Sequence, residues 1–124
     1  MAIYVLFMAI YVLFEVTPKI GRMEEYLSLA AGLMDELKKC PGFIRAERFK
    51  SVSKEVKLLS LSVWENKSSV SEWRSKAEHR MSQLAARDSL FESYSIAVAS
   101  GLRSYGKNER CEAPPDSNAF FCDR

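Results

Sequence analysis

Residues 57–65 read KLLSLSVWE, and this stretch decides how the chain folds. Apolar residues alternate along it with the period of two that is typical of a β-strand. One face of this strand receives Leu59, Leu61 and Val63, and the opposite face receives Trp64. Both faces are therefore apolar, which predicts a strand within a sheet that is covered on both sides.

Three further segments have the composition of strands. Residues 43–50 (FIRAERFK) precede the first stretch across a hairpin-length connection at residues 51–55. Residues 9–17 (AIYVLFEVT) are β-branched, aromatic and aliphatic, and Pro18 ends that run. Residues 92–100 (ESYSIAVAS) return to strand character near the end of the domain. Together these segments predict a sheet of four strands.

Two segments between the strands have helical periodicity. Apolar residues spaced by three and four follow Gly21, and Pro41-Gly42 ends this first helix. A second helix is expected after residues 66–68. Its apolar stripe consists of Val70, Trp73, Ala77, Met81 and Leu84.

The resulting order is β-α-β-β-α-β, which predicts an α+β, ferredoxin-like fold with a four-stranded antiparallel sheet. Two helices cover only one face of such a sheet, yet the second face is also apolar. The simplest cover for that second face is the same face of another copy. The sequence therefore predicts a symmetric homodimer.

Composition limits the classes of partner. The chain has 124 residues, which is the length of a single domain. It is 48% hydrophobic and 27% charged, as expected of a globular protein with a core. Its formal net charge is +2, and no long run of one sign occurs. We therefore expect neither nucleic acid nor a membrane surface as a partner.

The heptapeptide MAIYVLF occupies residues 1–7 and recurs at residues 8–14. We interpret residues 1–7 as a duplicated extension or an artefact, residues 8–106 as the folded domain and residues 107–124 as a C-terminal arm. The two copies together are shorter than the roughly 20 apolar residues of a membrane span. They also lack the basic start of a signal peptide.

The C-terminal arm departs from the pattern of the domain. Residues 114–118 (PPDSN) predict a loop, and Phe120 and Phe121 follow it. Two interpretations remain open at this stage. The arm is either a frayed terminus or a segment that docks its aromatic residues on this subunit or on a partner.

The sequence gives little support for a metal site or a disulfide framework. The three cysteines, Cys40, Cys111 and Cys122, include no C-x-x-C pair, and His79 is the only histidine. A closed zinc site would need all four residues to converge from distant segments. We expect no bound metal, free thiols and a reducing cytoplasmic compartment.

His79 is the one side chain of the sequence that ordinarily titrates near neutral pH, so it is a candidate for acid–base catalysis. On a straight helical wheel, however, it lies opposite the apolar stripe and would face solvent. A catalytic role requires the helix to break between roughly residues 74 and 78.

Trp73 lies on the apolar stripe, either as a core residue or as the wall of a site for a flat ligand. Ser60 and Ser62 share a strand face with Trp64, and such small side chains leave room for a ligand and offer it hydroxyl groups. They can equally lie beneath bulky neighbours. Three charged residues of the preceding strand are interpreted as an exposed edge, namely Arg45, Glu47 and Arg48.

With these elements in place, the chain resembles the antibiotic biosynthesis monooxygenase (ABM) domain family over about residues 8–106. The resemblance rests on the order and spacing of short segments. These are Pro41-Gly42-Phe43-Ile44, residues 59–65, Trp73 nine residues after Trp64, Glu78-His79-Arg80, and Tyr105 at the end of the last strand.

The resemblance implies a dimeric α+β barrel, in which two ferredoxin-like sheets pack face to face. It also implies a cofactor-independent monooxygenase that oxidises a small aromatic molecule (a quinol, polyphenol or polyketide-like phenol) with O₂. In that chemistry His79 would accept a proton and act with Trp73. The remaining substrate-binding residues would be Trp64, Phe14, Val12, Ser60 and Ser62.

Two alternatives stay open. The same fold and pocket would serve a non-catalytic dimer that binds a small apolar ligand. A sister group that resembles this domain degrades haem, with an Asn on the first strand and a His about ten residues after the Trp of the second helical region. Alignment on Trp73 puts Phe14 and Gln83 at those positions, and only His79, one helical turn away, could replace the histidine.

Overall fold

The computed structural model describes residues 8–83 and 86–121 of the chain. Both the heptapeptide extension at residues 1–7 and Leu84 of the expected stripe lie outside these residues. The elements are β1 (Ile10–Pro18), α1 (Met23–Leu37), β2 (Phe43–Lys50), β3 (Leu58–Trp64), α2 (Lys67–Gln83), α3 (Ala86–Ser89), β4 (Phe91–Ser100) and α4 (Pro115–Phe121). Through β4, their order and bounds follow the sequence pattern to within a few residues, with two exceptions. The short helix α3 was not expected, and β4 ends at Ser100, so Tyr105 lies beyond the last strand and not at its end.

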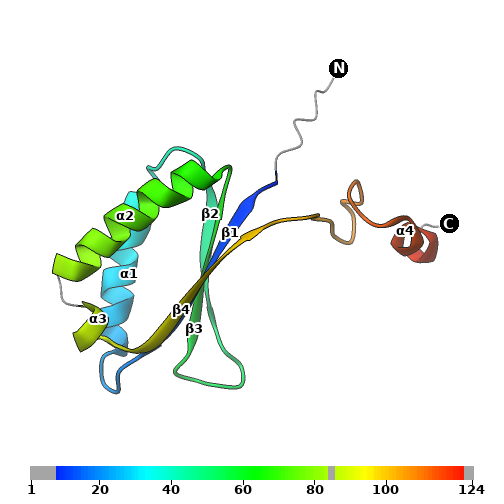
Figure 1. Ribbon diagram of the computed structural model, residues 1–124. Coiled ribbons are helices and arrows are strands. Elements are labelled where there is room, and N and C mark those ends of the chain that lie inside the picture. Colours follow the sequence, from blue (N-terminus) through cyan, green and yellow to red (C-terminus); the bar gives the residue numbers. More distant parts are fainter. Residues whose placement is uncertain (1–7, 84–85, 122–124) are drawn as a thin grey trace.

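The four strands form one antiparallel sheet in the order β2-β3-β1-β4. This arrangement confirms the predicted ferredoxin-like α+β fold. Both α1 and α2 lie on one side of the sheet (Figure 1). The register pairs Val12 with Ser62 and Leu13 with Leu61, so alternate residues of the central strands face the helices and face away from them.

The core divides into two clusters at opposite ends of the helix-covered face. One cluster contains the buried residues Val16, Tyr26, Leu58, Leu90 and Phe91. The other contains Ile10, Leu37, Trp64 and Val70. Between the ends of β1, Val12 and Phe14 are only half-buried. The middle of this face is thus less tightly covered than its two ends.

A tight turn joins α1 to β2 and sets α2 against it. Gly42 has a φ of 83°, a left-handed conformation that favours glycine. A Cβ at this position would lie 2.9 Å from Cβ of Ser69, in the first turn of α2. The Asn66 side chain accepts a hydrogen bond from the Ser69 backbone N–H at 2.9 Å and caps that helix. The predicted Pro41-Gly42 boundary therefore also fixes where the second helix begins.

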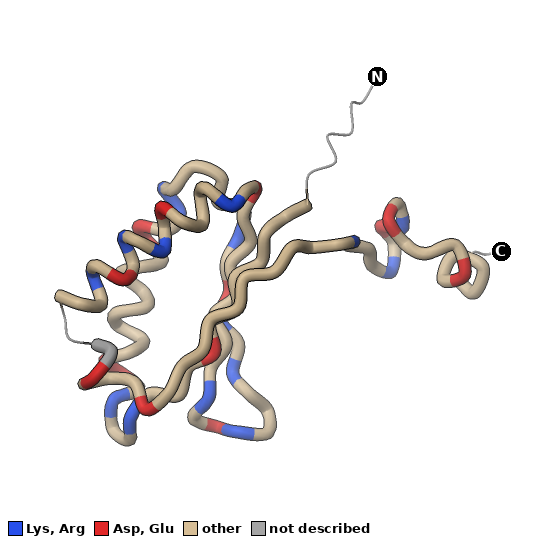
Figure 2. Tube along the Cα trace, in the orientation of Figure 1, with Lys and Arg blue, Asp and Glu red and all other residues tan. Residues whose placement is uncertain are grey.

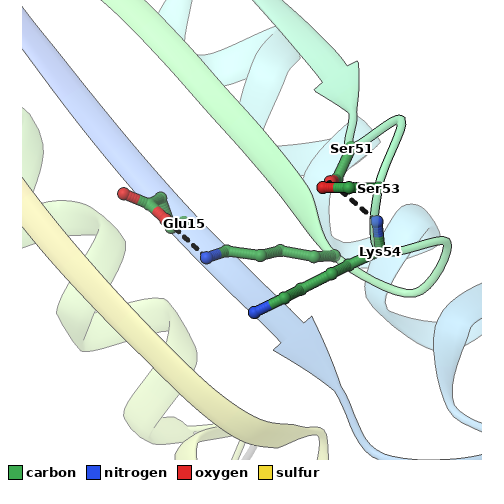
Figure 3. Close-up of polar contacts among 5 residues, drawn as sticks. Glu15, Ser51, Ser53 and Lys54 are labelled. Atoms are coloured by element: carbon green, nitrogen blue, oxygen red, sulfur yellow. Dashed lines mark hydrogen bonds and ion pairs between the residues drawn. The ribbon is translucent and has the colours of Figure 1, made fainter.

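The connection between β2 and β3 is folded on itself and tied to β1. Ser51 Oγ accepts a hydrogen bond from the Lys54 backbone N–H at 3.0 Å (Figure 3). Lys57 Nζ lies 2.7 Å from Oε1 of Glu15 on β1. Through this hydrogen bond and its charge, Lys57 lowers the pKa of the Glu15 carboxyl below its ordinary value. The pair is exposed, so its contribution to stability is small.

The C-terminal arm extends from β4 on the side of the sheet opposite to α1 and α2 (Figure 1). Residues 115–121 form a helix, so the expectation of a loop at 114–118 is wrong for most of that stretch. The physical reason is that Pro115 occupies a first helical position, where its fixed φ is favourable and its missing N–H costs nothing. Asp116 adds a favourable charge in the first turn.

Arg110 organises the arm internally. Its guanidinium donates hydrogen bonds to the Gly106 carbonyl at 3.0 Å and to Oδ1 of Asn118 at 3.2 Å. It also lies 5.2 Å from the ring centroid of Tyr105 and 5.6 Å from that of Phe121. Phe120 and Phe121 nevertheless remain 76% and 75% exposed. Neither ring is therefore buried against the rest of the subunit.

Charged residues are distributed unevenly over the fold. Figure 2 shows both signs mixed along the helices and at the β2–β3 connection, while most of β4 carries no charge. Among the described residues, no helix has the length and apolar character needed to cross a membrane.

Candidate functional site

A pocket of about 150 Å³ lies between the helices and the middle of the covered sheet face. It occupies the gap between the two core clusters, and an apolar cavity of about this size holds a benzene-sized molecule. The sheet contributes Val12, Phe14, Ala46, Arg48, Ser60, Leu61, Ser62, Phe91, Ile96 and Val98. The helices contribute Tyr26, Leu29, Ala30, Leu33, Met34, Leu37, Val70, Trp73, Arg74, Ala77, Glu78 and Met81.

The two serines of β3 lie in this pocket lining, on the strand face that bears Trp64. A serine fills far less volume than the leucines that flank it, which accounts for the space above the middle of the sheet. Ser62 Oγ accepts a hydrogen bond from Nε1 of Trp64 at 2.9 Å. Ser62 therefore also satisfies the only polar group of a completely buried indole.

Most of the residues expected at a binding site meet at this pocket. Trp73, Phe14 and Val12 line it together with the two serines. Trp64 does not line it, because its side chain is completely buried beneath Trp73. The two indole rings are stacked, with centroids 6.4 Å apart and planes 27° apart. Trp64 thus supports the wall that Trp73 forms.

His79 lies elsewhere. Helix α2 is continuous from Lys67 to Gln83, so the break that would turn His79 inward is absent from it. The His79 side chain is exposed and does not belong to the pocket lining. The helical-wheel position of this residue, opposite the apolar stripe, explains the placement. A proton-accepting role for His79 therefore has no geometric support within this subunit.

Two polar residues of the lining were missed by the sequence analysis. Arg48, expected at an exposed edge, is half-buried and faces the helices, with Ser60 as its partner in the β2–β3 register. Tyr26 of α1 is only 3% exposed. Strand alternation could have found Arg48, because Ala46 and Arg48 share the face of the serines, whereas Tyr26 looks like any other apolar position of its helix.

The phenol of Tyr26 lies close to Arg48 and to Ser60. Burial raises its pKa above the ordinary value, and the Arg48 charge and a hydrogen bond with Ser60 oppose part of that increase. The phenol consequently stays protonated at neutral pH and acts as a hydrogen-bond donor. The polar groups of the pocket thus include a phenol, a hydroxyl and a guanidinium near one another.

The rim of the pocket carries a neutralised pair of charges. Nη1 of Arg74 lies 2.8 Å from Oε1 of Glu78, and both side chains are more than half exposed.

Within the described residues, no group of three or more His, Cys, Asp or Glu side chains is placed to hold a metal ion. Because His79 lies outside the lining, the pocket also offers no imidazole to ligate haem iron. The pocket has room for a small organic molecule, and its lining includes groups that can donate hydrogen bonds.

Comparison with known proteins shows the family to which this chain belongs. A family model described as antibiotic biosynthesis monooxygenase matches residues 9–83, which include β1 to β3 and most of the pocket lining. The chain belongs to this family. The ABM model thus confirms the resemblance inferred from the spacing of the short segments.

A curated relative bears the name jasmonate monooxygenase ABM and comes from the fungus Pyricularia oryzae. It is 38% identical to this chain over 98 residues. The match covers 79% of this chain and 46% of the relative, so the chain spans about half the length of the curated protein that it matches.

Solved structures share the ABM fold at lower identity. The cofactor-independent oxygenase SnoaB from Streptomyces nogalater matches with a TM-score of 0.65 and 14% identity, over 77% of this chain and 95% of its own. A conserved protein from Methanosarcina mazei matches with a TM-score of 0.67 and 21% identity, over 77% and 94%. At these identities the likeness establishes the fold alone.

Proposed function

We propose that this ABM chain is a monooxygenase that transfers an oxygen atom from O₂ to a small, mainly apolar organic substrate. The observation that carries the proposal is the pocket beneath the helices, with a flat indole wall and few polar groups. The stacked tryptophans favour a planar aromatic substrate of the quinol, polyphenol or polyketide-like class. Family membership supports the reaction class.

The reaction that suits this pocket needs no metal or flavin, because the substrate itself supplies the electrons. A deprotonated, electron-rich ring transfers an electron to O₂, and the two radicals combine to form a carbon–oxygen bond. One oxygen atom remains in the product, and the other leaves as water with protons and electrons taken from the substrate. The name of SnoaB, a cofactor-independent oxygenase of the same fold, is consistent with this proposal.

The chain contributes position and environment to this reaction. Trp73, Phe14 and Val12 hold the ring between the helices and the sheet. Tyr26 and Ser60 donate hydrogen bonds to a substrate oxygen. The apolar lining excludes water, which limits side reactions of the intermediates. His79 has no part in this proposal, because it lies outside the pocket.

Oxygen consumption tests the proposed activity. Metal-stripped protein is mixed with a panel of hydroquinones, naphthols and jasmonate, and O₂ uptake is compared with autoxidation in buffer. We expect uptake that depends on protein and is insensitive to chelator. Trp73→Ala should lower kcat/KM strongly, and His79→Ala on the same helix serves as the control with unchanged kcat/KM. An equal kcat/KM in both variants would contradict the assignment of this pocket as the active site.

A second substrate class is favoured by the curated relative. Because that protein is named as a jasmonate monooxygenase and is 38% identical, jasmonate-like acids are candidates alongside phenols. Such an acid has no electron-rich ring, so its hydroxylation needs an added two-electron reductant, such as a reduced nicotinamide or flavin, to convert the second oxygen atom to water. Uptake with jasmonate and an added reductant, and not with phenols, would select this class. A ligand that binds in air and is recovered unchanged would instead indicate the non-catalytic binding function.

The second face of the sheet supports a homodimer. Leu13, Leu59 and Leu61 are only half-buried there, and Ala97 and Ala99 of β4 are exposed beside them. The C-terminal arm projects on this same side (Figure 1). We propose that another copy packs on this face to form a dimeric α+β barrel. We also propose a cytoplasmic location, which the free thiols of Cys40 and Cys111 support.

A further inference from the structure

Arg48 is an unusual residue for the place it occupies. It lines a pocket whose other walls are mostly aliphatic and aromatic, and its side chain is half-buried there. The ion pairs of the described residues involve Arg22, Lys57, Arg74 and Arg80, so Arg48 is without a carboxylate partner among them. A charge that is partly removed from water and left unpaired reduces stability.

The other charges at the pocket do not neutralise Arg48. Glu78 is the acidic residue of the lining, and it is already paired with Arg74 at the rim. The pocket as a whole therefore carries one excess positive charge. In an apolar environment such a charge attracts an anion more strongly than it would at the surface.

Arg48 and two of its neighbours form a set of three hydrogen-bond donors. Ser60 is its register partner on β3, and the Tyr26 phenol lies close to both residues. A protonated phenol and a serine hydroxyl both donate to an anionic oxygen.

We propose that Arg48, Tyr26 and Ser60 bind an anionic oxygen of the ligand, so that the pocket selects small apolar monoanions over neutral molecules of the same shape. This inference rests on the proposed function only in using the same pocket. The anionic oxygen is a phenolate or a carboxylate, and Arg48 binds either with charge-assisted hydrogen bonds.

For a phenolic substrate, Arg48 affects the reactivity of the ligand as well as the choice of ligand. The guanidinium stabilises the phenolate relative to the phenol, and the phenolate is the form that transfers an electron to O₂. Arg48 thereby increases the reactive fraction at neutral pH without accepting the proton, which leaves to water at the rim. This accounts for a pocket that lacks a histidine.

Binding to matched probes tests the proposal without any turnover. Benzoate and benzamide have the same size and differ in charge, and calorimetry gives the affinity of each. We expect benzoate to bind about 10- to 100-fold more tightly, the range for hydrogen bonds to a charged group. The phenolate arm uses 4-nitrophenol, whose visible band reports its ionisation, and its apparent pKa should fall on binding.

Three variants assign the effect to Arg48. Arg48→Gln should abolish the preference for benzoate and the pKa change of 4-nitrophenol, while Arg48→Lys should keep part of both. Lys50→Gln is the matched control, since Lys50 is on the same strand and the same sheet face but outside the pocket lining. That variant should behave as the unmodified protein.

The outcomes separate this inference from the proposed function. Equal binding of benzoate and benzamide together with an unchanged pKa of 4-nitrophenol would overturn it, and so would a preference that survives Arg48→Gln. A preference for benzoate alone would identify a carboxylate ligand, and an effect on 4-nitrophenol alone would identify a phenolate. An anion preference that depends on Arg48, in a protein that consumes no O₂, would retain the inference and reject the oxygenase.

Discussion

Trp73 stacks on Trp64 with ring centroids 6.4 Å apart, and of the two indoles only Trp73 lines the pocket. Trp64 is completely buried, and its N–H is bonded to Ser62. Trp73 is half-buried and faces the pocket. The inner ring therefore supports the outer ring where it forms a wall of the pocket.

The two tryptophans should respond differently to truncation. Trp64→Ala should lower the free energy of unfolding by about 3–5 kcal/mol, because it empties a fully buried volume. Trp73→Ala should cost less stability but should abolish most ligand binding. Denaturant unfolding and ligand titration on both variants check this. A larger loss of stability for Trp73 than for Trp64 would contradict the assignment.

Gly42 should be intolerant of any side chain. Gly42→Ala should destabilise the protein by about 1–3 kcal/mol, since a non-glycine residue is strained at its positive φ and its Cβ would press on Ser69. Gly32 provides the matched control, because it lies within α1 with open space around it. Gly32→Ala should stabilise the protein by about 0.5–1 kcal/mol, as measured by thermal or denaturant unfolding.

Tyr26 should make the fold sensitive to alkaline pH. Burial raises the pKa of this phenol in the folded state. The contribution of the neutral phenol to the free energy of unfolding is therefore fully present below the unfolded pKa of about 10. That contribution is lost as the pH rises through the folded value, because the unfolded chain ionises first. Tyr26→Phe should therefore lose less stability between about pH 9 and 11 than the unmodified protein. Parallel stability–pH curves would reject this expectation.

The apolar middle of the outer sheet face, at Leu13, should not tolerate a buried charge if a second copy covers it. Leu13→Glu places a carboxylate in the middle of that face, opposite Leu61 in the register. An unpaired buried charge costs about 3–5 kcal/mol, so the dissociation constant of the dimer should rise by about 100-fold or more. Sedimentation equilibrium measures this, with Ile20→Glu in a fully exposed turn as the control. Wild-type behaviour as a monomer would refute the dimer itself.

The C-terminal arm should contribute to the same assembly. Replacing both Phe120 and Phe121 by Ser removes two rings that are three-quarters exposed on the isolated subunit. We expect the dimer to weaken by about 10-fold, the effect of losing a modest aromatic anchor. Lys107→Ala changes an exposed residue of the same arm and should have no effect. An unchanged dissociation constant in the double variant would indicate that the arm stays free.

The sequence by itself determined the elements and their order. Alternation in residues 57–65 and the three-to-four spacing after Gly21 are local properties of strands and helices, so they can be recognised without knowing what packs on them. The same alternation placed Ser60 and Ser62 on one face, and a straight helical wheel already placed His79 toward solvent. Proline chemistry at residues 114–118 was the local signal that misled, because Pro115 starts a helix as readily as it enters a turn.

Only the tertiary structure decided which polar groups meet. Arg48 faces the pocket because its register pairs it with Ser60, and register is fixed by contacts between strands. Tyr26 reaches the same place from α1, which is distant in sequence from both residues and is positioned by packing on the sheet. Periodicity assigns a residue to a face, but long-range packing decides what lies opposite it. The grouping of Arg48, Tyr26 and Ser60 is therefore a property of the fold, whereas the two small serines that leave space beside them are already evident in the sequence of one strand.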